Sequence, residues 1–541
     1  MTKRKLPLVI AGLAVLAGVG LFVVKMTYES KIQNSIENFF ASLPAPLEAK
    51  AGKIDVSFFD KSVTITDITG GYKTENDVVT FSIAKIAAFG INENAAKEGA
   101  GVTEIAKKLT VENLLYDSKL MHAKIGSYAY RDISGDFNRI MHECVKAFPI
   151  VAAAYTDPEY ATSEKKQQQL LGELAPLLQA AETLTVGGGE AKDYTYSIPL
   201  ADSKALVTIA EFTVGKYSLR EMGPMAIKNI TCTPEGASAP LVSLEFLGMD
   251  GAELPSFAGL FAAIGQGVTS PALLKPYLQG QKFALKNLNA KNLTVRNPEN
   301  LDEILFSLGN SSFSYAATSV LAPAGGSDAA SVGQALSVHD ADLHFDGMKI
   351  AKILLERGKD LPASVLALMP ETFSYSGAVQ IKASAKDANN QSYDLDCKKI
   401  ALKENSLGEF SLSLAINDLN TMALVMGIPG PAALKGFDLS VKDTGASQLF
   451  FTATAEDKSE EGATPASLRA EALKGLPAPD ALPNDTLRGL NDAMRAFIEK
   501  PGNTLRITLA PATPLTVTAL QAAALAAPEK LGLSASTTPA E

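Results

Sequence analysis

The chain has 541 residues, of which 46% are hydrophobic, and its 49 basic and 59 acidic residues give a formal net charge of −10. Lysine and arginine form no cluster after the first five residues. A protein that binds nucleic acid needs a basic face, so nucleic acid is excluded as a partner. The length and the hydrophobic content are sufficient for two or three domains with sizeable cores.

Residues 6–24 form an uncharged run near the start of the chain. As a helix that rises about 1.5 Å per residue, this run would span roughly 28 Å, which is close to the hydrocarbon thickness of a bilayer. A secretory signal has a shorter apolar segment that ends at a small-residue cleavage site, and no such site directly follows Lys25. The pattern favours an uncleaved membrane anchor over a cleaved signal peptide or a buried core helix.

The basic residues around this run predict its orientation. Lys3, Arg4 and Lys5 precede it, whereas acidic residues dilute the lysines that follow it. The positive-inside rule therefore places the N-terminus in the cytoplasm. No second uncharged run reaches the required length. The sequence predicts a single-pass protein of a bacterial inner membrane, held through residues 6–24, with its bulk in the periplasm.

The segment that follows predicts a short helix up to about residue 43 and then a β-hairpin. Ile54 and Val56 alternate with polar residues, and Val63 and Ile65 do so again after a turn at residues 60–61. Such alternation on both sides of a turn is the pattern of two paired strands.

Further along the chain, apolar residues recur at helical spacing in several segments. The narrow apolar stripes of these segments predict helices that pack on the apolar face of a sheet. The predicted helices span residues 137–148, 165–182, 301–308, 350–355 and 487–498. A strand is expected near residues 503–518, and the last residues, 533–541, are expected to be disordered.

Two segments show the clearest strand pattern. Phe373, Tyr375, Val379 and Ile381 alternate with polar residues, and the positions from Phe410 to Ile416 do the same. Clean alternation is typical of antiparallel sheets with one wet face, whereas buried parallel strands have continuous apolar runs. The predicted fold class is therefore α+β: an N-terminal transmembrane helix followed by a β-rich, mainly antiparallel twisted sheet with packed helices.

A short phrase recurs irregularly in the sequence. A strand-like segment reaches Asn or Asp and resumes with Leu or Ile, as in "VTITDITG", "LTVENLLYD", "MAIKNITCT" and "FALKNLNAKNLTVRN". Because Asn and Asp favour turns, the phrase predicts a strand that ends in a turn and restarts. Its irregular spacing argues against a solenoid and for one sheet built by successive hairpin-like additions.

Two segments have the composition of linkers, residues 321–334 and 455–467. They divide the chain into four predicted parts. The first is a cytoplasmic tip and anchor, the next two are β-rich, and the last is a Pro/Ala-rich segment with a helix and a strand. Their predicted ranges are residues 1–25, 26–320, 335–456 and 468–541.

No constellation of residues supports catalysis. The face of one strand would carry Asp340, Asp342, His344 and Asp346, with His339 opposite, but this spacing matches no metal-ligand motif. His142 lacks the second histidine of the H-E-x-x-H zinc arrangement. The glycines at 187–189 lack the Lys-Ser/Thr pair of a phosphate-binding loop and are interpreted as a flexible turn. We therefore predict no catalytic residues, no metal, no cofactor and no enzymatic activity.

The three cysteines, Cys144, Cys232 and Cys397, are too few and too scattered for a disulfide framework. Cys232 and Cys397 both lie in strand-like segments and could pair in an oxidising compartment. Buried free thiols are the favoured interpretation.

An anchor followed at once by the hairpin "KIDVSFFDKSVTITDITG" resembles the start of AsmA-like bacterial envelope proteins. Alternatively, the chain is similar to the YdgA-like group of anchored envelope proteins, which shares the anchor and the β-rich exported region. The AsmA-like resemblance implies a long periplasmic sheet curved into a groove with an apolar interior, and a role in envelope lipid homeostasis or lipid movement.

The predicted function is envelope maintenance without catalysis, with phospholipid held or passed along an apolar sheet face. The side chains that would line this face are Phe373, Tyr375, Val379, Ile381, Phe410, Leu412 and Leu414. If helices cover the face completely, the same seven residues are ordinary core. The protein is then a structural or interaction module that binds other envelope proteins and has no small-molecule ligand.

Overall fold

The computed structural model describes residues 37, 40, 47–57, 59–73, 78–97, 99–118, 122–156, 163–199, 203–268, 282–321, 335–356, 361–386, 392–420, 431–458 and 462–539. The chain divides into two compact units, residues 1–283 and 284–541, each of which is described by itself. The predicted anchor, residues 6–24, lies outside the described residues. Among the described helices, none is long and apolar enough to cross a membrane.

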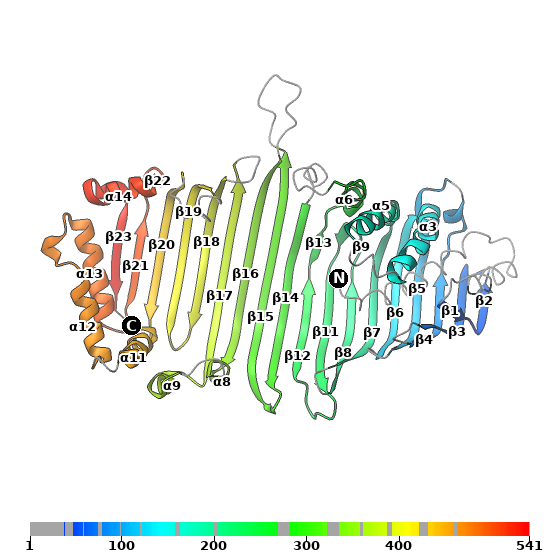
Figure 1. Cartoon of the computed structure of the whole chain (residues 1–541), viewed down its shortest axis with the longest axis horizontal. Helices are drawn as coiled ribbons and strands as arrows, with labels where there is room; N and C mark the ends of the chain where they lie inside the picture. The colour runs from blue at the N-terminus through cyan, green and yellow to red at the C-terminus, as the bar shows by residue number, and fades with distance from the viewer. Residues whose placement is uncertain are drawn as a thin grey trace, which may run out of the picture. The chain divides into compact units, whose positions relative to one another are not determined.

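Unit 1 (residues 1–283) is an antiparallel sheet with three α-helices in its described part (Figure 1). Its elements are β1 (Leu47–Lys50), β2 (Lys53–Ser57), β3 (Ser62–Lys73), β4 (Val78–Phe89), η2 (Glu93–Ala96), β5 (Val102–Asp117), β6 (His122–Asp136), α3 (Phe137–Thr156), α5 (Glu164–Ala181), β7 (Thr185–Pro199), β8 (Lys204–Val214), β9 (Tyr217–Ser218), β10 (Glu221–Met222), β11 (Met225–Pro234), β12 (Val242–Met249), β13 (Gly251–Glu253) and α6 (Phe257–Gly265).

Several sequence predictions for unit 1 are confirmed. β2 and β3 pair antiparallel as the predicted hairpin, with Ile54 opposite Ile65 and Val56 opposite Val63. The predicted helix at 137–148 is the first part of α3, and the one at 165–182 is α5. The glycines at 187–189, predicted as a flexible turn, are instead inside β7. A Cβ on Gly187 would lie 2.7 Å from the Cβ of Asp132, so glycine lets the two strands approach there.

Besides Asp132 in β6 (φ 50), four strands of unit 1 contain an Asn or Asp with a positive φ angle in mid-strand. They are Asp67 in β3 (φ 55), Asn113 in β5 (φ 51), Asp193 in β7 (φ 56) and Asn229 in β11 (φ 53). Three of them belong to the recurrent phrase in the sequence, for which a turn was predicted. That prediction is wrong, because each strand continues through the residue. Asn and Asp are the non-glycine residues that best tolerate this left-handed conformation.

The pairing register places these residues in one row across the sheet. Thr66 pairs with Lys85 and Ile68 with Ile83, so Asp67 lies opposite Ala84. The register of the following strands extends the row as Asp67, Ala84, Asn113, Gly126, Asp193, Ala210, Asn229 and Glu245. Every second member is an Asn or Asp with positive φ, and three of the four others are alanine or glycine.

At this row, each strand switches which of its alternating residues face the buried side of the sheet. In β5, the buried side chains are Leu109 and Val111 before Asn113, and Tyr116 after it. An extra residue in one strand alone would shift its register and turn its apolar side chains to the wrong face. Because every strand of the row has the extra residue, the register is kept and the apolar residues stay on one face.

The glycine in the row has a steric reason. A Cβ on Gly126 would lie 2.8 Å from the Cβ of Asp193, which is closer than two carbon atoms can pack. The left-handed Asp193 therefore brings its own Cβ against β6, and glycine at position 126 leaves room for it.

Helices α5 and α6 contact each other through two glycines. A Cβ on Gly265 would lie 2.2 Å from the Cα of Gly172, and a Cβ on Gly172 would lie 3.0 Å from the Cα of Gly265. The two backbones therefore touch at this point, and any side chain on Gly265 must push the helices apart.

We expect Gly265→Ala to destabilise the contact between α5 and α6 by about 1–3 kcal/mol, because overpacking moves backbone. Gly489 in α13 (Asp485–Glu499) is the matched control, since a Cβ there meets nothing within 4 Å. Gly489→Ala should be neutral or stabilise by up to about 1 kcal/mol, the helix-propensity gain. Thermal unfolding and hydrogen exchange of α5 peptides measure both variants. Equal stability of the two would contradict the close helix contact.

Unit 2 (residues 284–541) is also an antiparallel sheet. Its elements are β14 (Lys282–Asn297), which begins just before the boundary, β15 (Asn300–Leu321), β16 (Ala335–Ala351), α8 (Lys352–Glu356), α9 (Ala363–Leu368), β17 (Thr372–Ala385), β18 (Ser392–Glu404), β19 (Gly408–Asn420), β20 (Ala433–Asp443), α11 (Ala446–Asp457), α12 (Pro465–Gly475), η4 (Pro479–Ala481), α13 (Asp485–Glu499), β21 (Thr504–Leu509), β22 (Leu515–Thr516), α14 (Val517–Ala526), η5 (Pro528–Leu531) and β23 (Leu533–Thr538). Strands β15 to β21 pair in chain order, β22 lies beside β20, and β23 pairs with β21.

Three local predictions for unit 2 are wrong. Residues 301–308 form the start of β15, not a helix, and Phe306 pairs with Ile350 of β16. Of residues 350–355, the first two end β16 and the rest belong to the five-residue α8. Residues 533–538 form β23, although 533–541 were expected to be disordered. In each case a strand distant in sequence supplies backbone partners that local periodicity does not reveal.

The two compact units meet at residues 283/284. Of the linker predicted at 321–334, all but the first residue lies outside the described residues. β15 and β16, on either side of that segment, pair along most of their length. β20 pairs with β21, so the predicted parts 335–456 and 468–541 share one sheet. The predicted helix at 487–498 is confirmed as α13.

The two clusters of buried hydrophobic residues found in the described part of the chain both lie in unit 1. The larger one includes Ile65, Leu109 and Val111 from the sheet and Phe137 from the start of α3. Within its described residues, the sheet of unit 2 has no comparable cluster. The long antiparallel sheet is confirmed, and among the described residues the clusters of buried hydrophobic side chains lie in unit 1.

Candidate functional site

One face of the unit-2 sheet is apolar across several strands. Side chains that pair directly across strands point to the same face. Val379 of β17 pairs with Ile400, which pairs with Leu412, which pairs with Leu439. The next row is formed by Ile381, Cys397, Leu414 and Phe437. We call the surface that these rows form the apolar face, and the opposite surface the polar face.

All seven residues predicted to face lipid lie on the apolar face. Val379 and Leu412 share one row, Ile381 and Leu414 the next, and Phe410 lies in the row of Leu402. Phe373 and Tyr375 lie further along β17, where their rings stack with centroids 6.3 Å apart. The structure thus brings the two predicted segments together, through the intervening strand β18.

The apolar face is not covered by a second layer in the described part of unit 2. Figure 1 shows α8, α9, α11 and α14 at the ends of the strands and α12 and α13 beyond β21 and β23, and no helix crosses β15–β20. Val379, Ile381, Leu412 and Leu414 are accordingly only half-buried, and Phe410 is 37% exposed. Phe373, by contrast, is 2% exposed.

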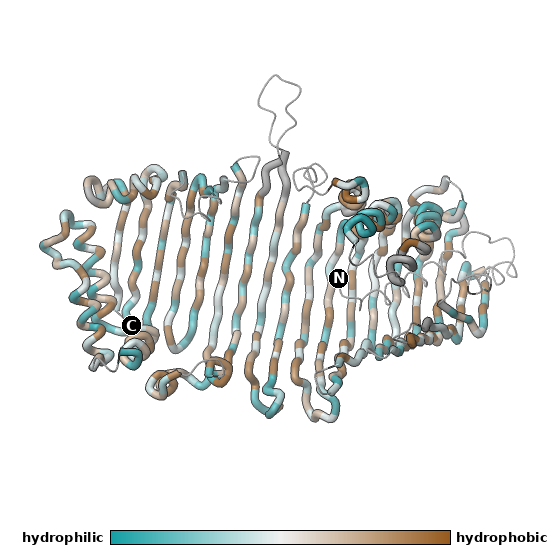
Figure 2. Tube along the Cα trace, in the orientation of Figure 1, coloured by the Kyte–Doolittle hydropathy of each residue, from teal (hydrophilic) through white to brown (hydrophobic). Residues whose placement is uncertain are grey.

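Sequence reasoning missed the contributions of β15, β16, β18 and β20 to this face. Phe313 and Leu343 extend the row of Val379 in one direction, and Leu439 extends it in the other. In β18 the alternation is interrupted, because the register shifts between Cys397 and Ile400. A search for strict alternation of apolar and polar residues therefore recognises β18 only on one side of this shift. Figure 2 shows hydrophobic and hydrophilic residues alternating along β15–β20.

Exposed hydrophobic side chains gather at one end of the unit-2 strands, which we call the apolar end. Eight large hydrophobic residues of the described part of unit 2 are exposed, and all but Val517 lie where β15 and β19 begin, where β18 ends, or on α8, α9 and α11: Ile304, Leu354, Leu355, Leu368, Leu402, Phe410 and Phe450. Ser364 of α9 donates a hydrogen bond to Glu456 of α11, which joins two of these helices.

The opposite end of the apolar face, which we call the polar end, carries three polar aromatic side chains. The hydroxyl oxygen of Tyr315 lies 2.8 Å from Nδ1 of His339. The ring of Tyr393 lies 6.4 Å from that of His339, measured between centroids. The sequence predicted that His339 and the aspartates of β16 lie on opposite faces of the sheet, and the pairing of β16 with β17 confirms this. It did not associate His339 with either tyrosine, because they come from other strands.

The polar face has a hollow of about 340 Å³. Most of its lining is polar: Asn287, Ser312, Ser314, Asp342, His344, Ala378, Gln380 and Lys399. Nε2 of Gln380 donates a hydrogen bond of 2.9 Å to Oδ2 of Asp342. The described residues contain no group of three or more His, Cys, Asp or Glu side chains placed to hold a metal ion. Asp340, Asp342 and His344 thus line a polar sheet surface.

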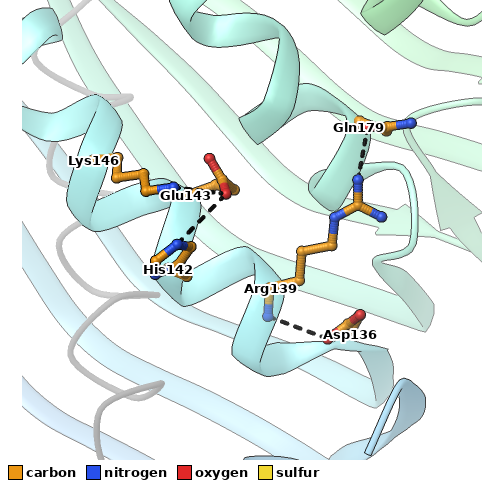
Figure 3. Close-up of polar contacts among 6 residues, drawn as sticks. All are labelled: Asp136, Arg139, His142, Glu143, Lys146 and Gln179. Atoms are coloured by element: carbon orange, nitrogen blue, oxygen red, sulfur yellow. Dashed lines mark hydrogen bonds and ion pairs between the residues drawn. The ribbon is translucent and has the colours of Figure 1, made fainter. Parts of the chain in front are cut away.

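Helix α3 of unit 1 carries the histidine of the incomplete zinc motif (Figure 3). Asp136 accepts a hydrogen bond of 3.2 Å from the backbone N–H of Arg139, and the Arg139 guanidinium donates one of 2.6 Å to Gln179 of α5. Nε2 of His142 lies 4.0 Å from a carboxylate oxygen of Glu143, and its side chain is 65% exposed. These contacts start α3 and join it to α5. An exposed ion pair of this kind contributes at most about 1 kcal/mol.

Cys144, Cys232 and Cys397 are free thiols in the structure. Burial raises the pKa of the Cys397 thiol, and the nearby Asp396 carboxylate raises it further. A thiol with a raised pKa holds little thiolate at neutral pH and is a poor nucleophile. Cys397 lies within the apolar face and contributes to it as a small hydrophobic side chain.

A family model described as "Uncharacterized protein" matches residues 383–538, which is less than a third of the chain. The matched segment runs from the end of β17 to β23 and so covers the last strands of the unit-2 sheet, including Phe410, Leu412 and Leu414. No curated protein matches the chain.

Proposed function

We propose that this protein is a membrane-anchored periplasmic protein of envelope maintenance that holds or passes lipid acyl chains along the apolar face of unit 2. The observation that carries the proposal is the combination of an apolar face several strands wide with the lack of a covering layer in the described residues. Each methylene moved from water onto such a surface contributes about 0.8 kcal/mol, so one acyl chain would bind with useful affinity.

The corrected secondary structure supports this proposal over a dry core. Residues 301–308 and 350–355 were predicted as helices that could cover the sheet. The first segment is part of the sheet itself, and α8 is too short to cover it. The proposed anchor at residues 6–24 would keep the apolar face near a bilayer of the inner membrane, and no cofactor or catalytic step is involved. This role agrees with the resemblance to AsmA-like envelope proteins.

The second candidate is a non-catalytic structural or interaction module without a small-molecule ligand. It is favoured by one observation, the gathering of exposed hydrophobic side chains at the apolar end, since large apolar patches also mark protein interfaces. The two candidates differ in what contacts the middle of the apolar face in the cell.

Site-specific photo-crosslinking of the full-length chain in a bacterial host distinguishes them. Phe410 is replaced by the aromatic crosslinker p-benzoylphenylalanine, which resembles phenylalanine and points from the apolar face. Ser411, its neighbour on the polar face, is the matched control position. After irradiation, mass spectrometry identifies what is attached at each position.

We expect lipid adducts at position 410 and none above background at position 411, because neighbouring residues in a strand point to opposite faces. Protein adducts without lipid at position 410 would favour the interaction module. Equal lipid labelling at both positions would also contradict the proposal, since it would reflect general proximity to the membrane.

A further inference from the structure

The polar end of the apolar face contains a hydrogen-bonded pair, Tyr315 and His339, with Tyr393 beside it. The three residues come from β15, β16 and β18. Besides the 2.8 Å hydrogen bond, the ring of His339 lies 6.3 Å from that of Tyr315 and 6.4 Å from that of Tyr393, measured between centroids. His339 is thus held between two phenols, and its partners on the neighbouring strands are apolar.

The neighbours of His339 leave space around it. In its own row, His339 pairs with Ala317 on one side and Ala383 on the other, and both are small apolar residues. A half-buried imidazole on an apolar surface is costly unless its nitrogens are hydrogen-bonded. Tyr315 engages Nδ1. When the hydroxyl of Tyr315 donates to Nδ1, the imidazole carries its proton on Nε2 and presents a second N–H donor on its other side.

Among the described residues, no carboxylate lies in the rows of these three residues; Glu404, which pairs with Tyr375, is at the apolar end of the face. Asp340 and Asp394, the acidic residues next to His339 and Tyr393 in sequence, pair with Lys382 and Ser384 on the polar face. The donors at the polar end therefore meet no negative side chain in their own rows. This arrangement suits an incoming anion.

The two ends of the apolar face differ, since this cluster lies at one end and the exposed hydrophobic residues lie at the other. Ala383, beside His339, lies ten positions along β17 from Phe373 near the apolar end, which is roughly 33 Å at about 3.3 Å per residue. One leaflet of a bilayer holds an acyl chain in about half of the roughly 30 Å hydrocarbon core. The apolar face is long enough for a lipid tail to lie along the strands with its head at the polar end.

We propose that Tyr315, His339 and Tyr393 form a binding site for the anionic head of a lipid, a carboxylate or a phosphate, whose tail lies along β17–β19 toward the apolar end. This inference rests on the proposed function and adds the orientation and the head-group class of the ligand. The N–H of His339 and the O–H of Tyr393 donate to the anionic oxygens, and Tyr315 holds the imidazole in the tautomer that does so.

Three photoactivatable probes with the same sixteen-carbon tail test the site on the purified full-length protein in detergent. Their heads are a carboxylate, a phosphate monoester and a neutral hydroxyl. The yield of covalent labelling on β17–β19 is measured by peptide mass spectrometry. We expect at least one anionic probe to label about tenfold more than the alcohol, because hydrogen bonds to charged groups are the stronger ones. The anionic probe that labels more identifies the source of the head.

The double variant His339→Leu/Tyr393→Phe should lower labelling by the anionic probe about tenfold, to the level of the alcohol, and leave the alcohol unchanged. Tyr393→Phe alone removes a single hydroxyl and should cause part of the loss without affecting folding. His344→Leu on the polar face is the matched control and should change nothing.

Equal labelling by all three probes on the unmodified protein would overturn the head-group site and leave the acyl-chain proposal standing. No labelling of β17–β19 by any probe would overturn the proposed function itself. An anionic preference that survives the double variant would also overturn the site, because the selectivity would then come from elsewhere.

Discussion

Replacing Glu404 by leucine should destabilise the β18–β19 hairpin of unit 2 by about 3–5 kcal/mol, the largest effect that we expect from any single substitution outside a core. Glu404 is 5% exposed, and its carboxylate accepts hydrogen bonds from the backbone N–H groups of Ser374, Ser406 and Leu407 and from the Ser406 hydroxyl. Leucine would leave three backbone donors without an acceptor, and each such loss costs about 1–3 kcal/mol.

Hydrogen exchange of peptides from β18 and β19 measures this loss in the full-length protein. Glu409→Gln is the control, because Glu409 is in the same hairpin but makes a surface ion pair, 2.9 Å from Lys403. That change should cost less than about 1 kcal/mol. If the two variants lose protection equally, the carboxylate of Glu404 does not hold the hairpin.

The same carboxylate makes this hairpin sensitive to acid. Burial opposes ionisation of Glu404, but the four hydrogen bonds outweigh it and hold its pKa below the ordinary value of 4.5. A lowered folded-state pKa means that the stabilisation is complete above the unfolded-state pKa and is lost as the pH falls through the folded-state pKa. The stability difference between the native protein and Glu404→Gln should therefore be constant near neutrality and shrink below about pH 4.5. A difference that is constant down to pH 3 would contradict this assignment.

The second large effect is expected at the row of left-handed residues in unit 1. Asn113 in β5 has a φ of 51°, and its side chain is exposed, so a substitution there changes backbone strain and not core packing. Asn113→Val should cost about 2 kcal/mol, because a β-branched residue fits poorly at positive φ even though valine favours strands. Asn113→Gly should be close to neutral, since glycine adopts this conformation freely.

Thermal unfolding and hydrogen exchange of β4, β5 and β6 peptides measure these two variants. The comparison separates strain from strand propensity, because propensity alone would favour valine over glycine. A valine variant as stable as the glycine variant would mean that β5 passes through position 113 without a left-handed residue. The strands would then not share one extra residue at this level of the sheet, which would contradict the row described above.

Much of the sheet could be predicted from the sequence, since alternation in β2, β3, β17 and β19 depends only on neighbouring residues. The same is true of α3, α5 and α13, whose apolar stripes and capping residues are local. The failures have a common cause. Residues 301–308 have helical spacing, but pairing of Phe306 with Ile350 outweighs it. Residues 533–538 look unstructured until β21 supplies their backbone partners.

The candidate site divides in the same way. The seven apolar residues of β17 and β19 were found because each strand alternates by itself, and the registers through β18 place them on one face. The cluster of Tyr315, His339 and Tyr393 was not found, because its members are brought together by pairing between distant segments. No local pattern identifies such a contact.

The sequence by itself determined the β-rich class, the antiparallel pairing and the identity of the apolar side chains, because alternation along a strand requires no knowledge of its partner. It also contained the Asn and Asp residues of the left-handed row, and for three of them, Asp67, Asn113 and Asn229, a turn was predicted. Only the tertiary structure decided that these residues keep eight strands in phase and that the described helices of unit 2 leave the apolar face uncovered. Both features depend on where neighbouring strands and helices lie in space, and the local residue pattern does not specify that position.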